Sequence, residues 1–225
     1  MAERTRQDQK EQAAAADIET TFRQAAADLD AAGVTWAVTG GLAVCAYTPP
    51  RPTEDVDFAV PAASDDEAEV IIGRLQVRGY VTGMRLDIPV GDEVTGTTDE
   101  LGNRRRLALA RLMRTDRPGP EVFVDLLFAL SGIEDLIVEH AQRIDILPGC
   151  AAPVASLGHL IAVKLLSARD TRPQDEMDLR ALLSVAGPGD LAQARDAVTV
   201  IGARGFGEGP VLREDLELRI RQAGR

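Results

Sequence analysis

The sequence predicts a mixed α/β fold over residues 1–152, followed by a helical bundle over residues 153–225. Two observations predict the first part: short β-rich segments in which apolar and polar side chains alternate, and a glycine pair between one such segment and a short helical stretch. The second part is predicted from helix-forming stretches that begin near Ser156 and are separated by proline and glycine. The boundary between the two parts is expected at 150–156.

The first elements of the chain follow from composition and periodicity. An alanine-rich, charged stretch that runs up to Gly33 predicts a helix with a glycine C-cap. The segment DVDFAV alternates acidic or small residues with apolar ones, which is typical of a strand with one buried face. The elements expected before residue 61 are a helix over 8–32, a strand over 34–39, a helical turn after the glycine pair, and a strand over 55–60.

The remaining elements are expected in a β-rich region and then in a helical one. Ser64 and Glu67 stand three residues apart before an apolar run, as in a capping box, and predict a helix start. Strands are expected within 80–130 and at 144–148, with a loop over 91–103, and the last part of the chain predicts helices over 155–170, 175–185, 190–205 and 211–222.

Composition limits the classes of function. Hydrophobic residues make up 45% and charged residues 27%, which is ordinary for a globular cytoplasmic protein, and no run approaches the roughly 18 apolar residues of a membrane span. The polar N-terminus predicts no secretory signal, and Cys45 and Cys150 are too few for a cysteine metal cluster. The net charge of −11 argues against coating nucleic acid through bulk electrostatics, but it leaves a local basic groove open.

Three aspartates are the candidate catalytic and metal-binding residues. Asp55 and Asp57 lie two apart on a predicted strand, so both side chains leave the same face and repel each other unless a cation lies between them. The alternative is a solvated strand face. Asp125 interrupts the apolar segment VFVDLLFAL, where a carboxylate needs a metal or an arginine partner. Three such carboxylates on neighbouring strands can hold two metal ions about 3.5 to 4 Å apart for phosphoryl or nucleotidyl transfer.

A glycine pair precedes the aspartates and is the candidate phosphate-binding turn. Gly40 and Gly41 follow Thr39 between a predicted strand and a predicted helix, where backbone N–H groups can approach a phosphate. An ordinary turn is the alternative. The spacing to Asp55 and Asp57, with Arg51 and Thr53 in between, favours the phosphate-binding role.

The segment TGGLAVCAYTPPRPTEDVDF, residues 39–58, resembles the signature of nucleotidyltransferases related to the DNA polymerase beta superfamily. Its Arg-x-Thr-x-Asp-hydrophobic-Asp form most resembles the AbiEii-type group, known for toxins of toxin–antitoxin and phage-defence systems. The segment KLLSARDTRPQDEMDLRALL is similar to a helical motif of that group, with Lys164, Arg172, Asp175 and Asp178 at the matching positions. The resemblance covers roughly residues 34–183.

This resemblance implies a polymerase-beta-like core with a short mixed sheet, followed by the helical bundle. It implies that Asp55 and Asp57 bind Mg²⁺ or Mn²⁺, that Asp125 completes the site, and that the glycine turn holds the phosphates of a nucleoside triphosphate (NTP). It also implies a toxin that acts on an RNA such as tRNA, with a cognate antitoxin as partner. The basic motif that these toxins often carry after the acid pair is not clearly present here, although residues 104–106 could replace it.

Several basic residues keep two interpretations. Lys164 is either a triphosphate contact or a lysine at the edge of a helix. Asp175 either pairs with Arg172 or takes part in catalysis, and Arg169 and Arg172 are candidate phosphate ligands. A cluster of arginines on and just after the predicted strand RRRLALARLMR forms either a basic face for a polynucleotide or a solvated edge strand protected by charge; they are Arg104, Arg105, Arg106, Arg111, Arg114 and Arg117.

The predicted reaction is transfer of a nucleoside monophosphate from an NTP to an acceptor hydroxyl. One alternative is a small-molecule nucleotidyltransferase similar to the aminoglycoside-modifying enzymes, because an acidic protein suits a cationic acceptor. The other is an inactive domain that binds a nucleotide or a partner without turnover.

Overall fold

The computed structural model describes residues 2–90, 96–98, 104–116, 122–168 and 173–224. Its strands are β1 Ala37–Val38, β2 Asp55–Ala59, β3 Tyr80–Pro89, β4 Thr97–Thr98, β5 Arg104–Arg114, β6 Phe123–Leu127, β7 Gln142–Leu147 and β8 Cys150–Val154. Its helices are α1 Ala2–Ala31, α2 Gly40–Cys45, α3 Asp65–Gln76, α4 Glu134–Glu139, α5 Leu157–Ser167, α6 Pro173–Val185, α7 Pro188–Ala203 and α8 Gly209–Gln222.

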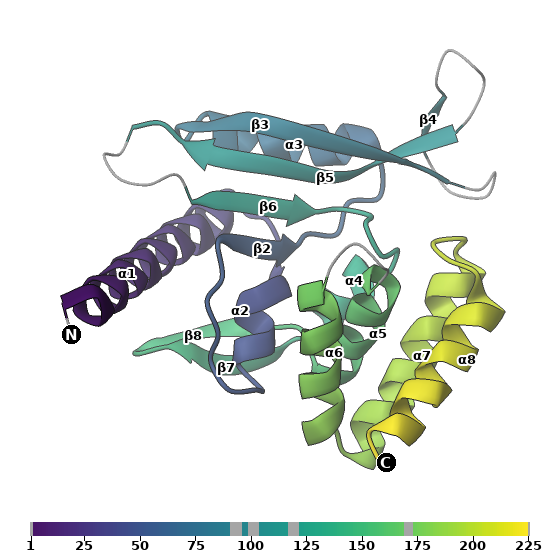
Figure 1. The fold of residues 1–225 in the computed structure, drawn as a ribbon. Coiled ribbons are helices and arrows are strands. Elements are labelled where there is room, and N and C mark those ends of the chain that lie inside the picture. The colour runs from purple at the N-terminus through teal and green to yellow at the C-terminus, as the bar shows by residue number, and fades with distance from the viewer. Residues whose placement is uncertain (1, 91–95, 99–103, 117–121, 169–172, 225) are drawn as a thin grey trace.

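The strands of the described residues form one mixed sheet in the order β3-β5-β6-β2-β1-β8-β7, with β4 paired to β5 (Figure 1). Strand β2 runs parallel to β6, whereas β5 runs antiparallel to β6 and β3 runs antiparallel to β5. The mixed α/β part is therefore confirmed, and it is followed by the predicted helices. None of the described helices is long and apolar enough to cross a bilayer.

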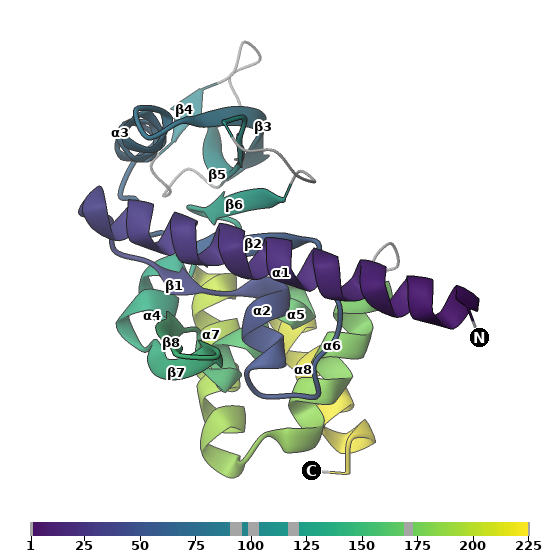
Figure 2. The same ribbon diagram turned by 90° about the vertical axis from the view of Figure 1, so that its left-hand side faces the viewer.

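Helix α1 covers one face of the central strands, as the alternation in β2 requires. It runs across the molecule beside β2 and β6 (Figure 2) and packs Phe22 against Phe58, with ring centroids 5.9 Å apart. Trp36 meets the same ring edge to face at 5.2 Å. Because Val56 and Phe58 point into this core, the side chains of Asp55 and Asp57 must leave the opposite face of the sheet.

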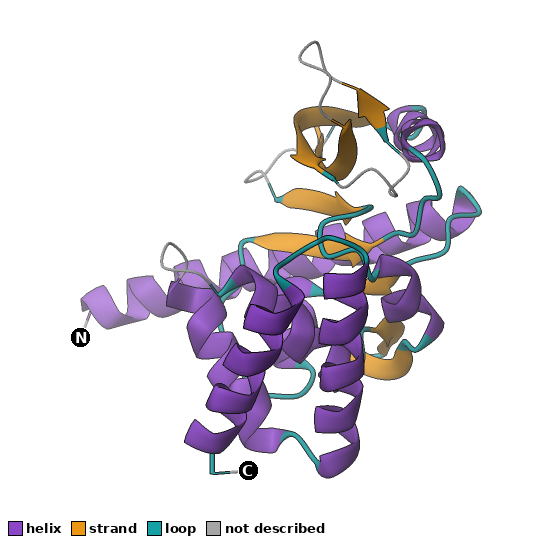
Figure 3. Ribbon diagram, turned by 90° about the vertical axis from the view of Figure 1, so that its right-hand side faces the viewer, coloured by secondary structure: helices purple, strands orange, loops and turns teal. Residues whose placement is uncertain are grey.

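Helices α5 to α8 form the bundle at the C-terminal end of the chain (Figure 3). Helix α5 is apolar nearly throughout and contacts α6, α7 and α8, and it also contacts α2. Helix α5 therefore joins the bundle to α2, the helix that begins at the glycine pair. Its burial agrees with the general rule that a helix apolar on all sides lies in a core.

Strand β8 and helix α4 were not predicted from the sequence, and in each case the local signals explain why. Strand β8 contains Pro153, which argues against a sheet interior, yet β8 pairs parallel with β1 and antiparallel with β7. Helix α4 has only six residues and its first turn has no side-chain cap, so local signals are weak. The loop expected over 91–103 contains the short strand β4, while residues 91–95 and 99–103 lie outside the described residues.

Candidate active site

The three predicted aspartates meet on the face of the sheet that α1 leaves free. Each of Asp55, Asp57 and Asp125 offers a carboxylate oxygen within 4.8 Å of the others. Asp125 is only 2% exposed, and the other two are half-buried. Asp55 and Asp57 lie at the wall of a cleft of about 810 Å³ whose other walls come from the glycine pair, α5 and α6.

Strand register brings these residues together. In the parallel pair of β2 and β6, Asp57 lies opposite Asp125 and Asp55 lies opposite Phe123. Opposite residues of neighbouring strands project from the same face, so the three carboxylates share one side. The back of the same strands is occupied by Val56, Phe58, Val124 and Leu126, which belong to the hydrophobic core.

The site holds its carboxylates against their mutual repulsion. Burial, together with the charges of Asp55 and Asp125, raises the pKa of Asp57 to about 7. Burial and the charge of Asp125 also raise the pKa of Asp55, although the charge of Arg111 opposes this. Two neighbouring carboxylates with raised pKa values, those of Asp55 and Asp57, favour either a proton or a metal ion.

The repulsion among the three carboxylates predicts that removing the charge of Asp57 stabilises the metal-free protein. The pKa of Asp57 lies higher in the folded state than the usual value of about 3.9, so its contribution to stability is complete below about pH 4 and is lost as the pH rises through about 7. We therefore expect Asp57→Asn, which stays neutral, to be more stable than the wild type at pH 8.5 by roughly 1–3 kcal/mol. The two proteins should be close in stability at pH 4.5.

Urea unfolding in the presence of EDTA at these two pH values measures the difference. A difference in the free energy of unfolding that stayed constant between pH 4.5 and pH 8.5 would contradict the view that ionised Asp57 destabilises the fold. A variant less stable than the wild type at both pH values would contradict it too.

The glycine pair lies directly against the aspartates. Gly40 has φ +60°, a conformation that side chains rarely adopt, and a Cβ atom there would overlap the carboxylate of Asp57. A Cβ atom on Gly41 would lie 2.6 Å from Oγ1 of Thr53. The backbone N–H of Gly41 hydrogen bonds to Asp57 and lowers its pKa. The turn therefore requires glycine because it presents bare backbone beside the acid pair.

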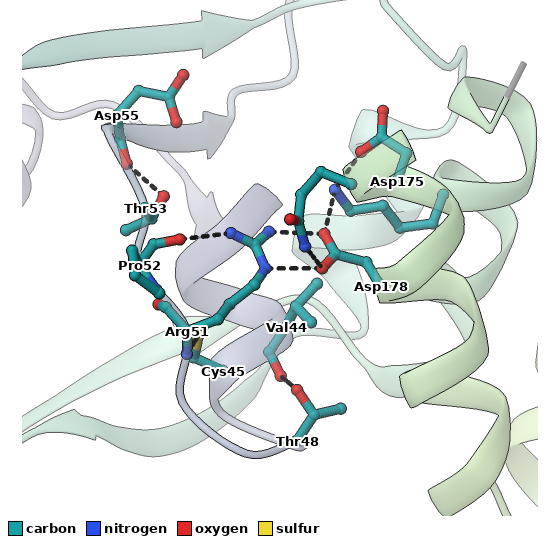
Figure 4. A network of polar contacts seen from close by, with 11 residues as sticks. Val44, Cys45, Thr48, Arg51, Pro52, Thr53, Asp55, Asp175 and Asp178 are labelled. Carbon is teal, nitrogen blue, oxygen red and sulfur yellow. Dashed lines mark hydrogen bonds and ion pairs between the residues drawn. The ribbon is translucent and has the colours of Figure 1, made fainter. Parts of the chain in front are cut away.

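A network of polar contacts ties Arg51, in the loop before β2, to Asp178 of α6 (Figure 4), and Lys164 contacts the same aspartate. Arg51 donates from Nε and from one terminal nitrogen to the two carboxylate oxygens of Asp178, at 2.7 and 2.6 Å, and from the other terminal nitrogen to the carbonyl of Pro52 at 2.8 Å. The Nζ of Lys164 lies 2.6 Å from Asp175 and 2.8 Å from Asp178.

This pairing separates the interpretations left open by the sequence. Lys164 is 8% exposed, so it is not a lysine at the solvated edge of a helix, and its Nζ is held by Asp175 and Asp178 while the residue lines the cleft. Burial lowers the pKa of Lys164, but the hydrogen bonds that it donates to the two aspartates raise it more, so Lys164 stays charged. Asp175 pairs with Lys164; Arg169 and Arg172 lie outside the described residues.

Arg111 belongs to the site, although the sequence named it only among the arginines of a possible basic face or edge strand. Its Nε and one terminal nitrogen donate to the two oxygens of Asp125 at 2.8 and 2.6 Å, and the same terminal nitrogen lies 3.3 Å from Asp55. An arginine partner was an expected alternative for Asp125, but its identity depends on the register that places Arg111 of β5 opposite Asp125 of β6. Sequence alone gives no signal for that register.

Four of the β5 arginines considered for a basic face are engaged within the fold: Arg105, Arg106, Arg111 and Arg114. Strand β5 lies between β3 and β6, so it is not an edge strand. Arg106 is buried and donates to the carbonyls of Ala62 and Ala63. Other described arginines of the strand have acceptors of their own: Arg105 the carbonyl of Asp87, Arg111 the site aspartates, and Arg114 Asp28 and Asp116. Arg117 lies outside the described residues.

A sheet that brings three carboxylates together beside a glycine turn, with a helical bundle across the cleft, is compatible with a nucleotidyltransferase. The chain belongs to the AbiEii family, whose profile matches residues 24–223 and is described as the nucleotidyl transferase AbiEii toxin of a type IV toxin–antitoxin system. No curated protein sequence matches significantly.

Solved structures similar to this chain have low sequence identity. One is a crystal structure from H. pylori, described provisionally as a nucleotidyltransferase, with a TM-score of 0.44, 15% identity, and coverage of 95% of this chain and 97% of that chain. Another is the solution structure of the antibiotic-resistance factor ANT(2'')-Ia, with a TM-score of 0.46, 16% identity, and coverage of 94% and 95%. A complex of ANT(2'')-Ia with adenylyl-2''-tobramycin has a TM-score of 0.44, 16% identity, and coverage of 89% and 97%.

Proposed function

We propose that this nucleotidyltransferase uses Mg²⁺ or Mn²⁺ to transfer a nucleoside monophosphate from an NTP to an acceptor hydroxyl. The observation that carries the proposal is the convergence of Asp55, Asp57 and Asp125 at one point beside the glycine turn. The conditions of the site fit a hard divalent cation, since the donors are carboxylate oxygens from two neighbouring strands.

Charge supports the dependence on a metal. Among the described residues in direct contact at the triad, three carboxylates face one guanidinium, that of Arg111. The charges of Arg51 and Lys164 are balanced by Asp178 and Asp175. A triphosphate would therefore meet a net negative surface. A bound divalent ion would supply the missing positive charge and polarise the phosphate that is attacked.

The residues of the chain then have distinct tasks. The acceptor oxygen forms a bond to the α-phosphorus, the bond from that phosphorus to the bridging oxygen breaks, and pyrophosphate leaves with the electron pair. We assign Asp55 and Asp57 to metal binding, and Asp125 to metal binding and to accepting the proton of the hydroxyl. Orientation of these groups by rigid strands lowers the entropic cost of the reaction.

The nucleotide side of the cleft is assigned to the glycine turn and its neighbours. The turn of Gly40 and Gly41 places bare backbone beside the triphosphate site; the N–H of Gly41 already donates to Asp57, and Thr53 lies against Gly41. Lys164 lines the cleft and is the candidate for a direct phosphate contact. Arg51 has its three guanidinium nitrogens engaged by Asp178 and Pro52, so we assign it to holding the loop that precedes β2 rather than to phosphate binding.

The family, described as a toxin of a type IV toxin–antitoxin system, supports a toxin role with a cognate antitoxin, and tRNA is the acceptor that we propose for it. A small cationic acceptor is a second candidate, and two observations favour it: the chain has a net charge of −11, and four arginines of β5 (Arg105, Arg106, Arg111 and Arg114) are engaged within the fold. Tight nucleic-acid binding normally requires free basic groups along the phosphate backbone.

Transfer of label distinguishes the two acceptors. The purified protein is incubated with Mg²⁺, each α-labelled NTP in turn, and either total tRNA or a panel of aminoglycosides. We expect one NTP to label tRNA, with release of pyrophosphate and complete loss of labelling in EDTA. Labelling of an aminoglycoside would select the second candidate. Binding of NTP without pyrophosphate release on either acceptor would instead indicate a domain that only binds nucleotide. Growth arrest on expression, relieved by Asp57→Asn, tests the toxin role separately.

A further inference from the structure

Arg111 occupies the space between two of the three site carboxylates. One of its terminal nitrogens lies 2.6 Å from Oδ2 of Asp125 and 3.3 Å from Oδ2 of Asp55, so a single nitrogen contacts both acids. The Nε of the same side chain holds the second oxygen of Asp125 at 2.8 Å. Such a two-pronged contact fixes a carboxylate in direction as well as in position.

A metal ion that bridged the same two carboxylates would need the same space. Mg²⁺ binds oxygen at about 2.0 to 2.1 Å and repels other cations at that range. An ion between Oδ2 of Asp55 and Oδ2 of Asp125 would overlap the terminal nitrogen of Arg111. The guanidinium and the ion therefore cannot hold these two oxygens at the same time.

The surroundings of Arg111 allow it to leave. Its side chain is 30% exposed, and its guanidinium stacks over the ring of Phe123 at 4.9 Å. Arg111 is thus held on one side by the aspartates and on the other by an aromatic ring, with solvent within reach. Lys164 differs from Arg111 in exposure and in partners. It is 8% exposed, and its partners are Asp175 and Asp178, which lie outside the triad.

We propose that Arg111 is a built-in substitute cation, which holds Asp55 and Asp125 in place in the metal-free enzyme and gives way when a divalent ion binds between them. Arg111 is then a positioning residue that keeps the carboxylates together before loading and that lowers the affinity for the ion by competing with it. This inference rests on the proposed metal dependence of the reaction.

Metal binding to variants tests the proposal without reference to turnover. Titration of the purified protein with Mn²⁺, followed by electron paramagnetic resonance and calorimetry, gives the affinity of the wild type and of Arg111→Gln. We expect Arg111→Gln to bind Mn²⁺ about tenfold more tightly or better, because a competing charge next to the ion is lost. We also expect its melting temperature in EDTA to fall below that of the wild type and to rise further than that of the wild type when Mn²⁺ is added.

Arg114→Gln is the matched control. Arg114 is on the same strand, pairs with Asp28 and Asp116, and stacks over Tyr80 at 5.3 Å, but it does not touch the triad. Its loss should leave the affinity for Mn²⁺ unchanged. If Arg111→Gln does not fold, Arg111→Lys keeps the charge but cannot grip both oxygens of Asp125, and its affinity should still exceed that of the wild type.

The possible failures are distinguishable. A wild type that binds no Mn²⁺ would sink the proposed metal dependence and this inference with it. A wild type that binds Mn²⁺, with Arg111→Gln or Arg111→Lys binding equally or more weakly, would overturn only the inference, because Arg111 would then be part of a metal-binding arrangement rather than a competitor.

Discussion

Asp57→Asn is expected to reduce the rate of nucleotide transfer by about a thousandfold or more while leaving the fold intact. Asp57 lies opposite Asp125 in the sheet and against Gly40, so its carboxylate stands between the other acids and the proposed phosphate turn. An amide of the same shape removes one negative metal ligand and keeps the packing. The loss should appear mainly in kcat, since the missing charge acts where charge develops during transfer.

Single-turnover transfer of labelled nucleotide at saturating Mg²⁺ measures this effect, and circular dichroism checks the fold. Asp145→Asn is the control, because Asp145 is an exposed aspartate on β7 of the same sheet, several strands away from the triad. Transfer by Asp57→Asn within tenfold of the wild type would remove Asp57 from the catalytic site. A comparable loss in Asp145→Asn would show that the assay responds to charge in general.

The alternation of side chains along a single strand was enough to predict the positions of Asp55 and Asp57 relative to each other. The alternation in DVDFAV places Asp55 and Asp57 on one face, because Val56 and Phe58 are needed in the core under α1. The lone acid in VFVDLLFAL predicted that Asp125 has a cationic partner or a metal. The helix start at Ser64 was also predicted from its capping residues, and the hydroxyl of Ser64 accepts a hydrogen bond from the backbone of Glu67.

Contacts between distant segments could not be predicted, because one sequence does not state strand register. The pairing of Arg111 with Asp125 depends on β5 lying antiparallel to β6 at one of several possible offsets, and a shift of one residue would turn Arg111 to the other face. The attachment of Arg51 to Asp178 likewise depends on how α6 docks, 127 residues further along the chain. The sequence marked all these residues as polar and left their partners open.

The charges of the cleft form two groups with different physical roles. Arg51, Lys164, Asp175 and Asp178 balance one another and join the bundle to the loop before β2. The triad has one guanidinium for three carboxylates and is therefore left with excess negative charge. Substitutions in the first group are expected to change the free energy of unfolding, whereas substitutions in the triad are expected to change the affinity for a metal ion. Experiments can therefore separate the two groups.

Asp178→Ala is expected to lower the free energy of unfolding by about 3–5 kcal/mol, the usual cost of leaving a buried charge without its partner. Asp178 is 2% exposed and accepts hydrogen bonds from Arg51 and Gln174, and Lys164 lies 2.8 Å away. Burial raises the pKa of Asp178, but the hydrogen bonds from Arg51 and Lys164 lower it by more, so the carboxylate is ionised. Its loss leaves Arg51 without its carboxylate partner and Lys164 with Asp175 alone.

Asp135→Ala provides the comparison, since Asp135 also accepts two bonds from an arginine, Arg204, but has a side chain that is 52% exposed. Exposed pairs contribute about 1 kcal/mol or less, so urea unfolding should show a several-fold smaller loss for Asp135→Ala. Because Arg51 would also release the loop beside Gly41, Asp178→Ala should transfer nucleotide more slowly under conditions in which it is fully folded. Equal losses of stability in the two variants would mean that the network around Asp178 is solvated and does not hold α6 against the sheet.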